Sequence, residues 1–110
     1  MIRLIITACA LALALPSAAG AAGHDRKFIL ALSANSIFTC ALFTLEGVSE
    51  ADPVFPNSPY FALPRSHPHF AEIYATLLTA RAINAPIGVY TTGATAACGF
   101  AEVQAVGIVK

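Results

Sequence analysis

Three histidines are the residues of this sequence whose chemistry best suits metal binding or proton transfer. His67 and His69 flank Pro68, and two imidazoles this close in sequence can share one metal ion. Glu72 is the only carboxylate near them, and no cysteine or second acid at ligand spacing completes a site. We therefore expect His67 and His69 to be cap and first-turn residues of a helix, and we expect neither a metal nor a cofactor.

His24 has a different metal-binding potential, which depends on where the exported chain begins. Removal of a leader after Ala21 would leave Ala22-Gly23-His24 as the new terminus. Its amine, two amides and imidazole can enclose Cu(II) or Ni(II) in a square plane. A shift of one residue in the cleavage site removes this arrangement.

Acidic residues and nucleophile motifs give little sign of catalysis. Glu46, Glu50 and Asp52 cluster, but they fall in a segment rich in proline and glycine, where we expect a solvated role or, less directly, calcium binding. The sequence has no G-x-S-x-G elbow, no phosphate-binding glycine loop and no H-E-x-x-H pair. We expect a protein that is not an enzyme.

Two aromatic side chains and an amide in the same segment are candidates for ligand binding. Phe55, Asn57 and Tyr60 lie within six positions of one another, and an aromatic ring beside an amide can stack on a sugar and hydrogen-bond to it. The other interpretation is that Phe55 and Tyr60 hold the loop against the rest of the fold.

The amino-terminal 22 residues have the pattern of a secretory signal peptide. Arg3 precedes an apolar run from Leu4 to Leu15, and 17 of the first 22 residues are apolar, against 46 of the 88 that follow. The small residues Ala19-Gly20-Ala21 fit cleavage after Ala21, and Gly20-x-Ala22 fits nearly as well, so we expect cleavage near residues 21–23. A lipid-attachment box ending at Cys9 is an alternative, but only eight residues precede it.

This interpretation places the remaining chain, residues 23–110, in the periplasm or outside the cell as one domain. The run of apolar residues is shorter than the roughly 20 that a membrane-spanning helix needs, so we expect no membrane span. Six acidic and five basic residues leave this domain with no excess of positive charge. That balance argues against a nucleic-acid partner.

The two cysteines outside the leader, Cys40 and Cys98, predict one disulfide. A redox C-x-x-C centre or a zinc site would need neighbours that this sequence does not have. We expect the bond to be structural.

Apolar periodicity predicts a mainly β domain with a single helix. A stripe of Phe70, Ile73, Tyr74, Leu77 and Leu78 indicates a helix packed on a core, with Pro68 in its first position and Asn84 at its end. A long surface loop covers residues 46–59. We expect strands at about 28–32, 37–45, 60–63, 87–92 and 100–109. This order, β-β-β-α-β-β, is that of the OB-fold, a five-stranded, partly open barrel.

Several segments resemble a group of small exported bacterial proteins, the B subunits of subtilase cytotoxin. They are Pro59-Tyr60-Phe61-Ala62-Leu63-Pro64, His67-Pro68-His69-Phe70, the helix from Ile73 to Ala80, Pro86-Ile87-Gly88-Val89-Tyr90 and Cys98-Gly99-Phe100. The resemblance covers roughly residues 37–109, mostly at core and turn positions.

The resemblance implies an OB-fold and, for the toxin members, a ring of five copies that binds sialylated glycans and carries a catalytic A chain. It also implies that sugar-contacting residues lie in the first strand and its flanks, and just past the tyrosine of the fourth strand. Thr91 holds that last place here.

Two functions follow as expectations. One is a noncatalytic, exported binding module that binds glycans and self-associates. The other is a freestanding periplasmic or secreted protein that binds a protein partner and no glycan. Small residues on the outer helix face, such as Ala71, Ala75 and Ala82, would permit helices of several copies to pack in a ring, although helix propensity alone favours the same residues.

Overall fold

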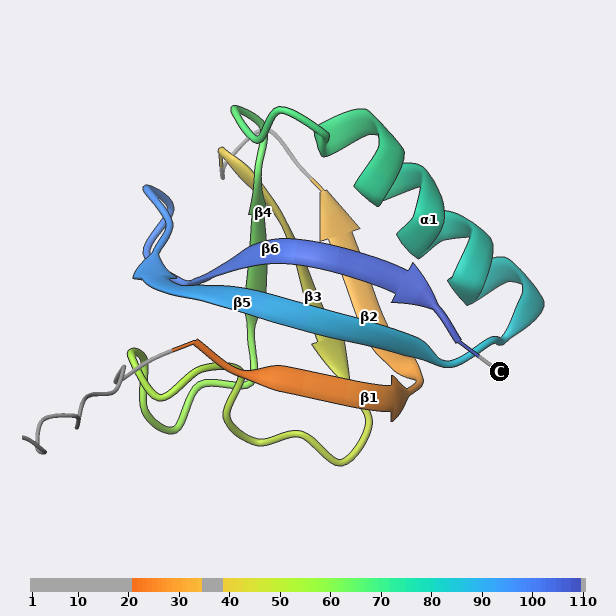
Figure 1. Cartoon of the computed structure of the whole chain (residues 1–110), viewed down its shortest axis with the longest axis horizontal. Helices are drawn as coiled ribbons and strands as arrows, with labels where there is room; N and C mark the ends of the chain where they lie inside the picture. Colours follow the sequence, from red (N-terminus) through yellow and green to blue (C-terminus); the bar gives the residue numbers. More distant parts are fainter. Residues whose placement is uncertain (1–20, 35–38, 110) are drawn as a thin grey trace, which may run out of the picture.

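The computed structural model describes residues 21–34 and 39–109, which form a mainly β domain with one helix (Figure 1). Residues 33–36, which separate the first two predicted strands, and residues 37–38 at the start of the second lie partly or wholly outside the described residues. The elements are β1 (Gly23–Lys27), β2 (Ile29–Ala34), β3 (Cys40–Leu45), β4 (Phe61–Pro64), α1 (Phe70–Ile83), β5 (Ile87–Thr95) and β6 (Ala101–Ile108).

All six strands belong to one mixed sheet with the order β1-β5-β6-β4-β3-β2. Every pair is antiparallel except β4 with β6, which is parallel. The two outer strands, β1 and β2, are consecutive in the chain and are separated only by Phe28. Figure 1 shows β5 and β6 crossing over the direction of β3 and β4, with α1 against β2 and β6. The short segment that contains β1 and β2 therefore supplies both edge strands of the sheet.

The structure has six strands where the sequence predicted five, because the chain before the predicted strand at 28–32 is also a strand and the two form the halves of one interrupted strand. Its first half, β1, has the polar sequence Gly-His-Asp-Arg-Lys and shows none of the apolar alternation that marked the second half. Its pairing with β5 shifts between His24 and Lys27, and Arg26 has a φ of 55°. A left-handed residue interrupts an extended chain, so the strand bulges here before β2 begins.

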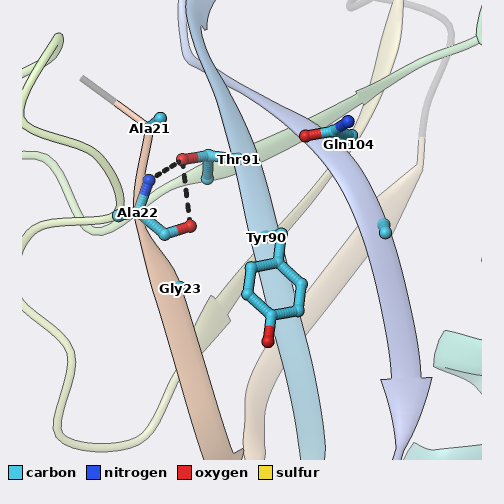
Figure 2. A pocket seen from close by; sticks show the side chains of 7 residues that line it. Ala21, Ala22, Gly23, Tyr90, Thr91 and Gln104 are labelled. Atoms are coloured by element: carbon cyan, nitrogen blue, oxygen red, sulfur yellow. Dashed lines mark hydrogen bonds between the residues drawn. The ribbon is translucent and has the colours of Figure 1, made fainter. Parts of the chain in front are cut away.

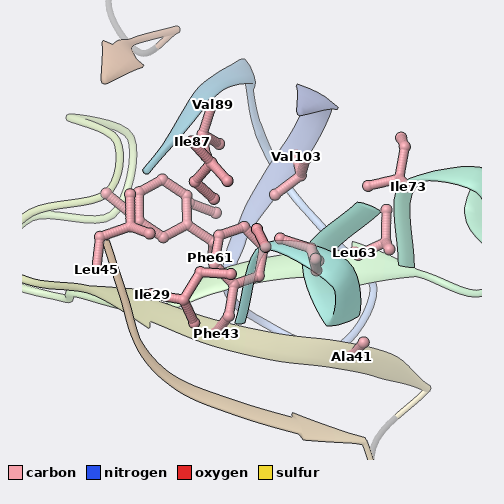
Figure 3. Close-up of a cluster of buried hydrophobic side chains, with 14 residues drawn as sticks. Ile29, Ala41, Phe43, Leu45, Phe61, Leu63, Ile73, Ile87, Val89 and Val103 are labelled. Carbon is pink, nitrogen blue, oxygen red and sulfur yellow. The ribbon is translucent and has the colours of Figure 1, made fainter. Parts of the chain in front are cut away.

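The core is formed by one face of the sheet together with α1 (Figure 3). Phe43 of β3 and Phe61 of β4 stack with ring centroids 5.0 Å apart, and both are fully buried. Figure 3 shows Ile87, Val89 and Val103 of β5 and β6 facing these rings. β3 and β4 are buried along their whole length, because a second, smaller apolar cluster covers their other face.

The helix begins later than Pro68 predicted. Its N-cap is His69, whose φ of −114° and ψ of 31° are not helical, and its first residue is Phe70. Asn84 ends it in the left-handed conformation, as expected. The predicted stripe was wrong at Leu78, which is 47% exposed; Ile73, Leu77 and Ala80 are the buried positions.

The burial of Leu77 and the exposure of Leu78 predict a large loss of stability for one substitution and a small loss for the other. Leu77→Ala should lower the free energy of unfolding by about 2–5 kcal/mol, because it opens a cavity in the core. Leu78→Ala should cost under about 1 kcal/mol, because nearly half of that side chain is already in water. Urea denaturation of both variants measures the difference. Equal losses would contradict the orientation of the helix.

The predicted pairing of the cysteines is present in the structure. Cys40, the first residue of β3, is bonded to Cys98 in the loop between β5 and β6, with the Cα atoms 6.1 Å apart. The bond joins positions 58 residues apart in the chain. Leu42 and Ala62 pack around it, and Cys40 is 1% exposed.

Because the bond closes a long loop, its loss should destabilise the domain strongly. The double variant Cys40→Ala/Cys98→Ala should lose about 4 kcal/mol of stability relative to the oxidised protein. Urea midpoints of the oxidised, reduced and double-variant proteins provide the measurement. A midpoint unchanged by both treatments would show that the bond is not structural.

Candidate functional site

A surface pocket of about 480 Å³ lies where the start of β1 meets β5 and β6 (Figure 2). Its lining comprises Ala21, Ala22, Gly23, Tyr90, Thr91, Gln104 and Ala105. This volume is within the range of small-molecule sites. None of the lining side chains is charged, so the pocket offers an aromatic ring, an amide and backbone groups to a ligand.

Tyr90 stands in the middle of the pocket because its two cross-strand neighbours are very small. It pairs with Gly23 of β1 on one side and with Ala105 of β6 on the other. A β-carbon built on Gly23 would lie only 2.8 Å from Cε1 of Tyr90, so the ring occupies the space that any other residue would fill. Tyr90 is 62% exposed, so a ligand can reach it from the solvent.

Gln104 reaches the pocket because β6 bulges beside Tyr90. Tyr90 and Thr91 are adjacent in β5, but their partners in β6 are Ala105 and Val103. Gln104 therefore has no residue opposite it in β5. A bulge turns such a residue away from the ladder and commonly aims it at a site. His67 lies beside this bulge, with its Nε2 3.1 Å from the carbonyl oxygen of Gln104.

Thr91 forms the floor of the pocket and joins three segments of the chain. Its hydroxyl oxygen accepts a hydrogen bond from the amide of Ala22 at 2.7 Å, and the hydroxyl donates to Oδ2 of Asp52. The amide of Thr91 donates to the carbonyl of Ala22 at 2.9 Å. Figure 2 shows Thr91 facing the backbone of Ala22. Thr91 is 3% exposed, so these bonds are shielded from water.

Asp52 was expected in a solvated loop, and the structure corrects this. The residue is fully buried, as is Ala51 before it. Oδ2 accepts from the amide of Ala21 at 3.1 Å and from the Thr91 hydroxyl, and Oδ1 accepts from the amide of Val54 at 2.9 Å. The expectation failed because a composition rich in proline and glycine marks a loop without showing that part of it turns inward.

The loop candidates Phe55, Asn57 and Tyr60 do not line the pocket. Phe55 stacks on Phe100 with centroids 5.8 Å apart, and Tyr60 contacts the same ring at 5.3 Å. Asn57 is exposed and has a φ of 62°. Through these contacts Phe55 and Tyr60 hold the loop against Phe100, which lies just before β6. Tyr60 nevertheless remains 43% exposed. Of the predicted ligand-binding residues, only Thr91 lies in the pocket.

His24 lies apart from the other two histidines, whereas the ring centroids of His67 and His69 are 6.1 Å apart. Nε2 of His24 lies 2.8 Å from the carbonyl of Ala51, and its ring meets Phe61 edge-on. Nδ1 of His67 accepts from the amide of His69, so His67 caps the turn before α1. Within residues 21–34 and 39–109, no group of three or more His, Cys, Asp or Glu residues is arranged to hold a metal ion.

Sequence reasoning missed Gly23, Gln104 and Ala105. The alternation of β5 could have identified Tyr90: Val89 and Thr91 on either side of it face inward, so Tyr90 has to be an exposed aromatic residue. The bulge that presents Gln104 depends on strand pairing, for which the sequence has no local signal.

Comparison with models of protein families, with curated proteins and with solved structures found no match to this chain. No helix in the described part of the chain is long and apolar enough to cross a membrane.

The hydroxyl of Thr91 should contribute measurably to stability. Thr91→Val keeps the shape but leaves the amide of Ala22 and one Asp52 oxygen short of a partner, so we expect a loss of about 1–3 kcal/mol. Thr92→Val is the matched control, because Thr92 is exposed and should change stability by less than about 0.5 kcal/mol. Urea denaturation compares them, and an equal effect of both substitutions would contradict the buried junction.

Proposed function

We propose that this protein is an exported, noncatalytic binding module with an OB-fold, and that it binds a glycan in the pocket beside Tyr90. The observation that carries the proposal is the placement of an exposed aromatic ring between two strands that bear only small residues at that point, in a pocket that the Gln104 amide also lines. The resemblance to toxin B subunits led us to expect sugar contacts in this part of the fold.

The topology supports the OB-fold. If β1 and β2 are counted as one bent strand, the sheet has five strands, and the first pairs with the second and the fourth. The third and fifth are parallel neighbours, and the helix lies between the third and fourth in the chain. A first strand shared between both ends of the sheet is what closes a small barrel.

The chemistry of the pocket suits a sugar. The apolar C–H face of a pyranose ring can pack on an exposed tyrosine ring, while its hydroxyls both donate and accept hydrogen bonds. Gln104 offers both an amide N–H and a carbonyl for such bonds. Of the places that the resemblance indicated, the residue after the fourth-strand tyrosine is Thr91, which lines the pocket.

The experiment is a glycan array probed with the oxidised protein after export, including sialylated and unsialylated members of the same oligosaccharides. We expect binding that falls at least about tenfold, or 1.4 kcal/mol, in Tyr90→Ala and in Gln104→Ala. Tyr90→Phe should retain most of the binding, because the ring remains.

Tyr60→Ala discriminates between the pocket and the aromatic loop. Binding that survives Tyr60→Ala supports the pocket, and binding lost only in that variant would move the ligand surface to the loop. An array with no bound glycan would contradict the proposal and favour the other function, a freestanding exported protein with a protein partner. Circular dichroism of each variant controls for folding.

A further inference from the structure

We infer that export gives the buried carboxylate of Asp52 a counter-charge: the α-amino group of the exposed residue Ala21, which is released by removal of the leader after Gly20. The inference rests on the export that belongs to the proposed function, and it does not depend on the ligand. It also places the cleavage one residue before the position that the small-residue pattern first suggested.

Asp52 is unusual because it is a fully buried acid that has hydrogen-bond donors but no cationic partner. Its exposed fraction is 0%, and its three donors are two amides and the Thr91 hydroxyl. Among residues 21–34 and 39–109, the ion pairs are Arg26 with Asp25 and His69 with Glu72, both at the surface. Buried carboxylates are normally paired with a positive group, because an isolated charge is costly in a low-dielectric interior.

The backbone nitrogen of Ala21 already occupies the position of a counter-ion. It lies 3.1 Å from Oδ2 of Asp52. As an amide it donates one neutral hydrogen bond; as an ammonium group it would donate a charge-assisted one from the same place. The neighbouring bonds between Ala22 and Thr91 hold the nitrogen there in either form.

The conformation of Ala21 is a second, independent observation. Its φ is 55°, a left-handed value that costs free energy for any residue with a β-carbon. The φ torsion of Ala21 is measured from the carbonyl carbon of residue 20. This strain therefore exists only while residue 20 is attached. Cleavage at that bond removes the strain and keeps Ala21 in place.

The reaction that releases the Ala21 amine is the hydrolysis of one peptide bond. A signal peptidase hydrolyses the Gly20–Ala21 peptide bond with one water molecule, which leaves a carboxylate on Gly20 and, after protonation, an ammonium group on Ala21. Ala18 and Gly20 satisfy the requirement for small residues at the first and third positions before the cut. Cleavage after Ala21 or Ala22 would discard the nitrogen that contacts Asp52.

The first test is the mass of the protein purified after export of the full-length precursor in a bacterial host. We expect a chain that begins at Ala21. A chain that begins at Ala22 or Gly23 would overturn this inference; the proposed function would still be tested separately, by the glycan array with Tyr90→Ala and Gln104→Ala. A chain that keeps its leader would contradict export, and the proposed function with it.

The second test asks whether the charge of the amine acts on Asp52. Acetylation of the processed protein neutralises the amine but keeps its N–H, and it should lower Tm by about 4 °C or more. The same treatment of Asp52→Asn should lower Tm by much less, and Asp25→Asn, which removes an exposed carboxylate, should behave like the unaltered protein. Lysine acetylation is common to all three proteins, so it cancels. Equal shifts in all three would overturn the inference.

A third readout needs no variant. At neutral pH a free α-amine normally reacts with acylating reagents faster than lysine does, because its pKa is lower. Pairing with Asp52 should slow the labelling of the Ala21 amine at least about tenfold in the folded protein relative to the urea-unfolded protein, as a 1.4 kcal/mol interaction would. Similar rates in both states would show that the amine is free, and would overturn the inference even if Asp52→Asn does not fold.

Discussion

The buried carboxylate of Asp52 is the interaction on which the arrangement of the site depends. Its oxygens accept hydrogen bonds from three places far apart in the sequence: the start of the described chain at Ala21, the turn at Val54 and the hydroxyl of Thr91 in β5. Desolvating a carboxylate is costly, and several donors aimed at its oxygens offset that cost. These bonds join the loop that contains Asp52 and the chain at Ala21 to β5.

The pocket is a consequence of two irregularities in the sheet that this junction holds in place. Ala22 is fixed to Thr91, which sets Gly23 directly opposite Tyr90 and leaves the ring exposed over a residue without a side chain. On the other side, β6 bulges at Gln104, which lines the same pocket.

The sequence predicted what depends on local patterns and missed what depends on pairing. The apolar stripe of α1, the Asn84 cap and the Cys40–Cys98 bond could be predicted, since each has a local or compositional signal. The polar strand β1 could not, because its stability comes from pairing with β5 rather than from its own residues. Asp52 was missed for the same reason: two of its three donors lie 31 and 39 residues away in the chain, and the local donor, Val54, does not mark it as buried.

The measurement that tests this account most directly is native-state hydrogen exchange at the amide of Thr91. That amide donates to the carbonyl of Ala22, so it reports whether the start of β1 stays attached to β5. The account predicts protection close to that of amides in the buried strand β4, because the Asp52 junction should open only when the domain unfolds. Exchange at the rate of a fraying terminus, with β4 fully protected, would contradict it.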